Sequence, residues 1–375
     1  MVAPELFIDA LRRNGVSFFA GVPDSLLKNV CACITDNVDR EHNIITANEG
    51  AAVGVAAGHY LATGELPVVY MQNSGIGNAV NPLLSLADEK VYSVPVLLMI
   101  GWRGEPGVHD EPQHVKQGEV TLSLLDAMDI SYSILPAEDK EAERVITELA
   151  DACRKSCKPH AVIIRKGTFG PYNLRTKVPN DNPLSREEAL KLVVESIPVD
   201  SVIVSTTGKL SRELYEYRDE RRRSHESDFL TVGSMGHSSS IALGIALARP
   251  DRRVFCFDGD GAFIMHMGAI SNIGNLAPGN YVHIVFNNGA HESVGGQPTL
   301  GFGIDIPRIA KACGYRHAVS VTTDAEIRKA LEEALSAEGP SLIELRVGIK
   351  SRDDLGRPKT TPQENKEAFM KFVLK

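Results

Sequence analysis

Two short polar motifs in the second half of the sequence carry the clearest chemical signal. One is DGDGAF at residues 258–263, the other is NNGA at residues 287–290, and each directly follows an apolar run. The carboxylate of Asp260 and the amide of Asn288 offer oxygen ligands that suit a hard cation such as Mg²⁺, above all one shared with phosphate oxygens. The glycines would let the backbone approach a diphosphate closely. Because DGDG alone is also an ordinary turn sequence, the pairing of the two motifs is the stronger signal.

These motifs need neighbouring strands that end at the same edge of a sheet. Apolar runs without polar alternation recur along the chain, as is typical of parallel strands covered on both faces. Helical patterns at residues 49–63, 239–248 and 324–337 lie between them. The alternation predicts an α/β protein with doubly wound parallel sheets, which bind ligands at the carboxyl ends of their strands. The predicted strands are residues 17–20, 43–47, 67–72, 94–100, 160–164, 201–205, 253–257, 281–286 and 341–347.

A change of composition between two such α/β halves predicts the domain boundary. Residues 169–184 are rich in Gly, Pro and Asn and lack periodicity, and Ser185 then opens a capping-box pattern. We therefore expect one domain at residues 1–168, a linker after it, and a second domain at residues 185–350. The basic tail at residues 351–375 is a candidate cover for the active site.

The composition excludes several other classes of protein. The chain has 375 residues and a net charge of −8, without the basic excess of a nonspecific nucleic-acid binder. No apolar run approaches the roughly 18–20 residues that span a membrane, and acids near the N-terminus favour an amphipathic helix over a signal peptide. The six cysteines lack zinc-site spacing, so we expect reduced thiols in a cytoplasmic protein.

The combination of the two motifs resembles the signature of the thiamine-diphosphate-dependent 2-keto-acid decarboxylase family. That signature pairs GDG with NN, and each of the two motifs closes an apolar strand. The stretch from Gly259 to Asn288 is comparable in length to the stretch that joins the two motifs in the family. In the family, the motif aspartate, the second asparagine and a nearby backbone carbonyl hold Mg²⁺. The resemblance assigns these roles to Asp260, Asn288 and the carbonyl of Ala290, and it implies thiamine diphosphate and Mg²⁺ as cofactors.

Further segments match the cofactor site that the family implies. A polar loop at residues 205–208 matches the diphosphate-binding loop. Met235 matches the side chain that props the cofactor in a bent shape, although alone it would be an ordinary core residue. Glu49 matches the glutamate that shares a proton with N1′ of the pyrimidine ring, although alone it would be a helix N-terminal acid. The implied cofactor-binding residues are Glu49, Thr207, Gly208, Gly233, Met235, Gly259, Asp260, Gly261, Ala262 and Asn288.

The reaction that the resemblance implies is non-oxidative decarboxylation. In it the cofactor carries the covalent chemistry, while the protein orients the carboxylate, moves protons and excludes water. The chain has no room for the central third domain of many family members, and its layout is most similar to the phosphonopyruvate and sulfopyruvate decarboxylases. The segments GVPDS and HDEPQH and the glycine-rich extension of NNGA carry this similarity. Beside Glu49, the implied catalytic residues are Asp24, His109 and His114 as proton shuttles.

The resemblance implies a small anionic 2-keto acid as substrate, whose terminal group needs cations. We predict His291, Arg357 and Lys359 as its ligands, although most single basic residues are solvated surface charges. The HES sequence after NNGA favours phosphonopyruvate, giving phosphonoacetaldehyde, over sulfopyruvate.

A non-catalytic cofactor-binding protein and a carboligase or oxidative enzyme of the same family also stay open. The family builds each site from two subunits, so we expect at least a homodimer, with no nucleic-acid or membrane partner. Further candidates for ligands of the terminal anionic group are the basic residues beside the motif segments, Arg103, Lys116, Lys209 and Arg352.

Overall fold

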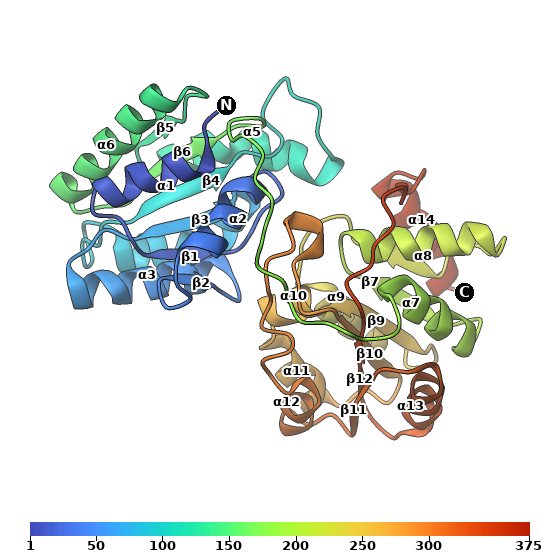
Figure 1. Cartoon of the computed structure of the whole chain (residues 1–375). Coiled ribbons are helices and arrows are strands. Elements are labelled where there is room, and N and C mark those ends of the chain that lie inside the picture. The colour runs from blue at the N-terminus through green and yellow to red at the C-terminus, as the bar shows by residue number, and fades with distance from the viewer. The chain divides into compact units, whose positions relative to one another are not determined.

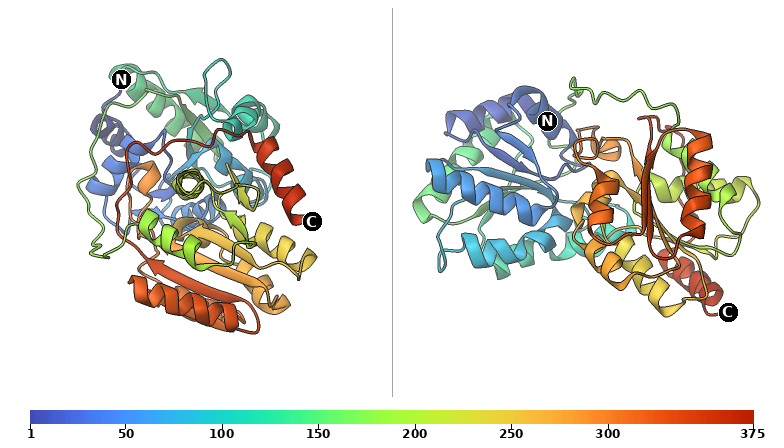
Figure 2. Two further views of the ribbon diagram at one scale, coloured as in Figure 1. Left: turned by 90° about the vertical axis from the view of Figure 1, so that its right-hand side faces the viewer. Right: turned by 90° about the horizontal axis from the view of Figure 1, so that it is seen from below.

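Each half of the chain folds into an α/β unit around one parallel six-stranded sheet, which confirms the predicted fold class (Figure 1). The computed structural model describes all residues, 1–375. The first unit comprises Met1–Lys177 with His291–Gln297, and the second comprises Val178–Ala290 with Pro298–Lys375. Figure 2 shows the layers of helices and sheet in each unit from two further directions.

The two sheets have the same strand topology. The first has the strand order β2-β1-β3-β4-β6-β5 and the second has the order β11-β12-β10-β9-β7-β8, with all pairs parallel. In both sheets the strands therefore leave their polar loops at one edge. The strands are β1 (Phe19–Gly21), β2 (Asn43–Ile45), β3 (Val68–Gln72), β4 (Leu97–Gly101), β5 (Tyr132–Ile134), β6 (His160–Ile164), β7 (Val202–Ser205), β8 (Asp228–Leu230), β9 (Val254–Gly259), β10 (Tyr281–Asn287), β11 (His317–Val321) and β12 (Ser341–Arg346).

Helices bury the sheets from both sides. In the first unit α1, α2 and α6 form one apolar core with the sheet, and α3, α4 and α5 form the other. In the second unit α7, α8 and α13 pack into a single core with their sheet. The helices are α1 (Pro4–Arg13), α2 (Lys28–Asn37), α3 (Glu49–Thr63), α4 (Ile76–Pro82), α5 (Pro112–Ala127), α6 (Asp139–Ser156), α7 (Arg186–Ser196), α8 (Lys209–Glu220), α9 (Ser238–Ala248), α10 (Asp260–Met265), α11 (Ala269–Leu276), α12 (Ile306–Ala312), α13 (Asp324–Ser336) and α14 (Pro362–Val373), with short turns η1 (Asn73–Gly75), η2 (Leu83–Ala87) and η3 (Glu292–Val294).

Polar residues set the helix ends near the predicted positions. The side chain of Asn48 accepts the N–H of Ala51 at the start of α3, and that helix ends at Gly64, whose φ of 75° is left-handed. At the start of α7, Ser185 and Glu188 form the predicted capping box. These caps satisfy backbone groups that would otherwise lack an intrahelical partner.

The linker at residues 169–184 is irregular but anchored at two points. The carboxylate of Asp36, on α2, accepts the backbone N–H groups of Arg175 and Thr176, each at 2.8 Å. A few residues later, Asn180 donates to two backbone carbonyls of the second unit. Each end of the linker is therefore fixed to the unit that it adjoins.

The C-terminal tail is part of the second unit. Asn365 of α14 donates from Nδ2 to the carbonyl of Asp228 at 2.8 Å and accepts the N–H of Leu230 at 3.1 Å. The ring of Phe369 lies 5.4 Å from that of Phe229, centroid to centroid. The helix thus covers β8, the edge strand of this sheet, which would otherwise expose unpaired backbone groups.

No helix in the structure has both the length and the apolar character needed to cross a membrane. All six cysteines are free thiols, and four of them are buried. Burial raises the pKa of Cys33 to about 11 and that of Cys153 to about 12. These two thiols are therefore protonated and unreactive at neutral pH.

Candidate active site

The two polar motifs of the second unit meet because their strands are neighbours. In the parallel register of β9 and β10, Gly259 pairs with Phe286. Asp260, the first residue of α10, and the turn that contains Asn288 therefore leave the sheet at the same level of its carboxyl edge. The backbone N–H of Gly289 donates a hydrogen bond to the Asp260 carboxylate. Both predicted metal-binding motifs thus lie at one place, the edge where α/β sheets bind ligands.

Asp260 is a buried acid whose hydrogen-bond partners are all neutral. It is 4% exposed, and its carboxylate accepts from the hydroxyl of Thr299 and from the backbone N–H groups of Gly261 and Gly289. Burial raises the pKa of Asp260 from 3.8 to about 6, more than these donors lower it. Because a buried carboxylate is costly without a positive partner, a divalent cation fits this position.

Hydrogen bonds from distant parts of the chain hold the NNGA turn. Asn180, in the linker, donates from Nδ2 to the carbonyl of Asn288 at 2.9 Å. Asn287 donates to Oε1 of Glu344 at 2.6 Å, and the N–H of Ala290 donates to Oδ1 of Asn288 at 3.0 Å. Asn180 and Glu344 were not predicted from the sequence, because an asparagine in a linker and an acid in a strand carry no signal of such a contact.

The loop after β7 offers polar groups where a diphosphate is predicted to bind. Thr206 is 4% exposed, and its buried hydroxyl has no hydrogen-bond partner. Thr207 donates from Oγ1 to the carbonyl of Val232 at 2.8 Å, which fixes the loop. Gly208 precedes α8 with a φ of 105°, and the first N–H groups of a helix lack intrahelical partners. A buried hydroxyl without a partner beside such N–H groups fits phosphate oxygens.

Met235 is half-buried in the loop between β8 and α9. Ser234 and Gly236 on either side have positive φ angles of 52° and 84°, so the loop turns sharply there. A Cβ atom at Gly236 would overlap the ring of His266, at the end of the helix that begins with Asp260. The glycine therefore lets the Met235 loop pack against the metal-motif helix, as a residue that props the cofactor requires.

Glu49 is held at the carboxyl edge of the first sheet. It is the first residue of α3 and is 5% exposed. Its Oε2 accepts a hydrogen bond of 2.7 Å from Nδ2 of Asn78. A Cβ atom at Gly75 would overlap the Glu49 carboxylate, so only glycine leaves space for it. Asn78 and Gly75 were not predicted, since small and polar residues in this segment carry no signal of a contact with Glu49.

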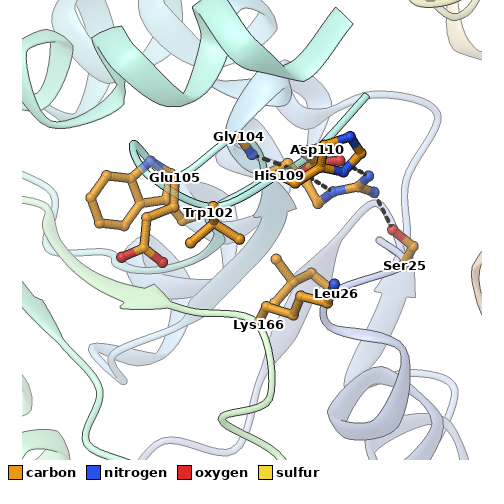
Figure 3. A pocket seen from close by; sticks show the side chains of 10 residues that line it. Ser25, Leu26, Trp102, Gly104, Glu105, His109, Asp110 and Lys166 are labelled. Atoms are coloured by element: carbon orange, nitrogen blue, oxygen red, sulfur yellow. Dashed lines mark hydrogen bonds and ion pairs between the residues drawn. The ribbon is translucent and has the colours of Figure 1, made fainter. Parts of the chain in front are cut away.

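Asp24 and the predicted histidines lie at the same edge. Asp24 is 2% exposed, and its Oδ2 accepts the N–H of Leu26 at 2.9 Å. Burial raises the pKa of Asp24 from 3.8 to about 6 in spite of this bond and the nearby Arg103 guanidinium. His109 lies in the loop after β4 (Figure 3), and His114 lies in the first turn of α5, which follows that loop. The predicted proton-transfer groups therefore follow β1 and β4, two parallel strands of the same sheet.

His291 directly follows the NNGA turn, in a glycine-rich loop. Its backbone N–H donates to the carbonyl of Gln297 at 2.8 Å, which closes the loop. Burial lowers the pKa of His291 from 6.5 to about 4. Its ring is therefore neutral at pH 7 and brings no positive charge to an anion, which leaves the predicted substrate contact without electrostatic support.

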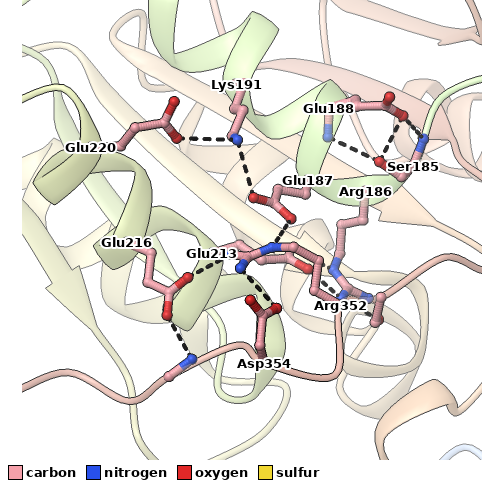
Figure 4. A network of polar contacts seen from close by, with 12 residues as sticks. Ser185, Arg186, Glu187, Glu188, Lys191, Glu213, Glu216, Glu220, Arg352 and Asp354 are labelled. Carbon is pink, nitrogen blue, oxygen red and sulfur yellow. Dashed lines mark hydrogen bonds and ion pairs between the residues drawn. The ribbon is translucent and has the colours of Figure 1, made fainter.

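Arg357 and Lys359 follow a stretch of the tail that is tied to helices. Arg352 pairs with Glu187 of α7 at 2.8 Å and with Glu216 of α8 at 2.5 Å (Figure 4). These ion pairs satisfy Arg352, so its role is to hold the tail on the second unit. Lys359 is exposed and makes no hydrogen bond or ion pair. The role of Arg357 and Lys359 as substrate ligands stays a prediction.

Comparison with known proteins identifies the family. Residues 1–129 match the model "Thiamine pyrophosphate enzyme, N-terminal TPP binding domain", and residues 206–345 match "Thiamine pyrophosphate enzyme, C-terminal TPP binding domain". A phosphonopyruvate decarboxylase from Streptomyces viridochromogenes is 36% identical over 100% of this chain and 95% of its own length. The chain belongs to the thiamine pyrophosphate enzymes.

Two further relatives of this thiamine pyrophosphate enzyme are similar over most of its length. A phosphonopyruvate decarboxylase from Streptomyces hygroscopicus is 35% identical over 100% of this chain and 94% of its own. A sulfopyruvate decarboxylase from Methanosarcina acetivorans is 28% identical over 88% of this chain and 87% of its own. Within the two matched domains, Asp24 and Glu49 fall in the N-terminal match, and Asp260 and Asn288 fall in the C-terminal match.

Proposed function

We propose that this thiamine pyrophosphate enzyme decarboxylates phosphonopyruvate, a small anionic 2-keto acid, to phosphonoacetaldehyde and CO₂ with the help of Mg²⁺. The observation that carries the proposal is the full-length similarity to two phosphonopyruvate decarboxylases, at 36% and 35% identity. The buried acid Asp260 and the unpartnered hydroxyl of Thr206 support it, because a metal diphosphate would supply a partner for each.

In this proposal the second unit binds the charged end of the cofactor. Asp260, Asn288 and the carbonyl of Ala290 would hold Mg²⁺ together with phosphate oxygens, a ligand set that suits this ion. The loop that contains Thr207 and Gly208 would receive the diphosphate. Met235 would support the part of the cofactor between its two ends.

The first unit supplies the groups that handle protons. When bound, the cofactor provides the electron sink that accepts the electron pair of the carbon–carbon bond when CO₂ leaves. Glu49 would hold a proton at N1′ of the pyrimidine ring, with Asn78 fixing the direction of its carboxyl group. Asp24, His109 and His114 would orient the substrate carboxylate, exclude water and return a proton to the product.

We expect Asp24 to set one limb of the pH profile. As a proton donor it must be protonated, and its pKa of about 6 lies well above the ordinary 3.8. The value of kcat/KM should therefore fall about tenfold for each pH unit above 6. Asp24→Asn should remove this limb and lower kcat at pH 6 by about 100-fold, measured as CO₂ release between pH 5 and 8.

A matched variant and a stability measurement separate this role from a structural one. Asp39→Asn changes an exposed acid of the same unit and should leave the profile as it is. Between pH 3.8 and 6 the folded chain binds more protons at Asp24 than the unfolded chain, so ionisation at higher pH opposes folding. Asp24→Asn should therefore be at least as stable as the wild type at pH 7.5. An Asp24→Asn enzyme that keeps the limb would contradict the assignment.

We also propose that the chain works as at least a homodimer. In the resembled family, the pyrimidine-binding domain of one subunit faces the diphosphate-binding domain of another. Both kinds of domain match this chain, so each copy carries both halves of such a site.

The substrate is tested by direct assay. The purified protein with thiamine diphosphate and Mg²⁺ is incubated separately with phosphonopyruvate, sulfopyruvate and pyruvate, and CO₂ and aldehyde are measured. We expect the highest kcat/KM with phosphonopyruvate. Sulfopyruvate is the second candidate because of the similarity to the Methanosarcina acetivorans enzyme, and a preference for it would replace phosphonopyruvate as the substrate.

A further inference from the structure

A cavity of about 160 Å³ opens in the first unit where the loops after β1, β4 and β6 meet (Figure 3). Three basic side chains, Arg103, His109 and Lys166, line it together with Ser25 and Trp102. The cavity is smaller than the roughly 300–1,000 Å³ of pockets that hold a whole ligand. Its size suits one terminal group of a small molecule.

The two acids on the cavity wall are already neutralised. Asp110 accepts from Nε and Nη2 of Arg103, at 2.8 and 2.5 Å, and from the backbone N–H groups of Gly104 and Glu111, each at 2.8 Å. These donors hold its pKa well below the ordinary range. Glu105 pairs with Arg165 at 2.8 Å. Neither carboxylate is therefore available to repel or replace a bound anion.

Arg103 is fixed in place and still has donors to offer. Besides its two bonds to Asp110, it donates from Nη1 to Oγ of Ser25 at 2.7 Å (Figure 3). A guanidinium group carries five N–H donors, so two are left for a ligand. Because Asp110 and Ser25 hold the planar group still, little side-chain entropy is lost when it binds an anion.

Lys166 adds a second positive charge to the cavity, and His109 lines the cavity with it. Lys166 follows β6 and His109 follows β4, so they reach the cavity from different loops. Both are exposed, and neither makes a hydrogen bond or an ion pair. In a protein with a net charge of −8, a lysine without a counter-ion beside a fixed arginine is a local site for an anion.

We propose that this cavity binds the terminal phosphonate of the substrate, through the two remaining N–H groups of Arg103 and the side chain of Lys166. The inference rests on the proposed function and names the part of the chain that selects a keto acid with a second anionic group. A tetrahedral oxyanion can accept from the guanidinium and from an ammonium group at once. Arg103 was among the basic residues considered from the sequence and Lys166 was not, and neither belongs to the predicted ligand set of His291, Arg357 and Lys359.

The test uses the holoenzyme and two variants. Lys166→Met removes an exposed, unpaired cation, and Arg103→Lys keeps the charge but loses the planar pair of donors. We expect each to raise KM for phosphonopyruvate by about tenfold or more, with kcat changed by less than about threefold. Lys155→Met, another exposed and unpaired lysine of the first unit, should leave both constants unchanged.

A direct measurement of anion binding distinguishes a failure of this proposal from a failure of the proposed function. Isothermal titration with phosphonoacetate, which carries the phosphonate and a carboxylate but no keto group, should give a Kd weakened about tenfold or more in both variants. If the wild type binds phosphonoacetate in this way but releases no CO₂ from phosphonopyruvate, the proposed reaction is wrong and the anion site stands. If turnover is normal and Lys166→Met, whose fold should be intact, changes neither KM nor the Kd, the anion site is overturned.

Discussion

Asp260→Ala should abolish Mg²⁺-dependent binding of thiamine diphosphate, weakening the cofactor Kd by more than about 100-fold. Asp260 is buried beside the NNGA turn, and its carboxylate has only neutral donors around it. Its negative charge attracts a cation more strongly than the neutral oxygens of Asn288 and of a backbone carbonyl, which cannot replace it. Titration of the cofactor at fixed Mg²⁺, followed by calorimetry or fluorescence, measures the loss.

The same variant should not unfold the protein. Burial raises the pKa of Asp260 to about 6, so the ionised carboxylate opposes folding above that pH in the absence of a cation. The metal-free Asp260→Ala protein should therefore have a Tm at or above that of the wild type at pH 7.5. Asp251→Ala, at an exposed acid of the same unit, is the matched control and should bind the cofactor normally. Normal cofactor binding by Asp260→Ala would remove the metal assignment.

Glu49→Gln should leave cofactor binding nearly unchanged and lower kcat by about 100- to 10,000-fold. Glutamine has the same shape, and its side-chain oxygen can accept the same hydrogen bond from Asn78. It cannot take up and share a proton with N1′ of the pyrimidine ring, which is the chemical role proposed for Glu49. CO₂ release under saturating cofactor gives kcat, and calorimetry gives the cofactor Kd.

Proton exchange at C2 of the bound cofactor locates the defect. In deuterated water this exchange should slow in Glu49→Gln as strongly as turnover does, because both need the activated form of the pyrimidine. Glu41→Gln, at an exposed acid in the same unit, is expected to behave as the wild type. Full activity in Glu49→Gln would refute the central role of this glutamate, and slow exchange in the wild type would favour a non-catalytic cofactor-binding protein.

The central strands could be predicted from the sequence, but most edge strands could not. Continuous apolar runs arise where a strand is covered on both faces, which holds for strands such as β4 and β10. The three unpredicted strands, β5, β8 and β11, all lie at sheet edges. All residues of β5 are only half-buried, and β11 alternates between buried and more exposed residues. β8 begins with Asp228, a buried acid that pairs with Arg218 at 2.8 Å. Because of this charged residue, the strand lacks the continuous apolar run from which it could be predicted.

The residues of the site could likewise be predicted only where a local sequence pattern indicates them. Asp260 and Asn288 follow strands at a spacing that can be recognised locally, and the register of β9 and β10 brings them together. Asn180 and Asn78 act through contacts made only after folding, and nothing in their neighbours indicates those contacts. The cavity around Arg103 belongs to this second group. An arginine near a loop is ordinarily a solvated charge, and only the bonds to Asp110 and Ser25 show that this one is fixed.

The anchored linker makes the metal turn sensitive to mechanical load. Between Thr176, bonded to Asp36, and Asn180, bonded to the carbonyl of Asn288, only residues 177–179 are untied. Four residue steps can span at most about 14 Å, so the two anchor points cannot lie further apart than this while both bonds are kept. Tension along this tether would reach Asn288, the proposed metal ligand. Cleavage of the chain after the exposed Lys177 would give two polypeptides, and each anchor would stay with its own half. The NNGA turn would then be free of that tension.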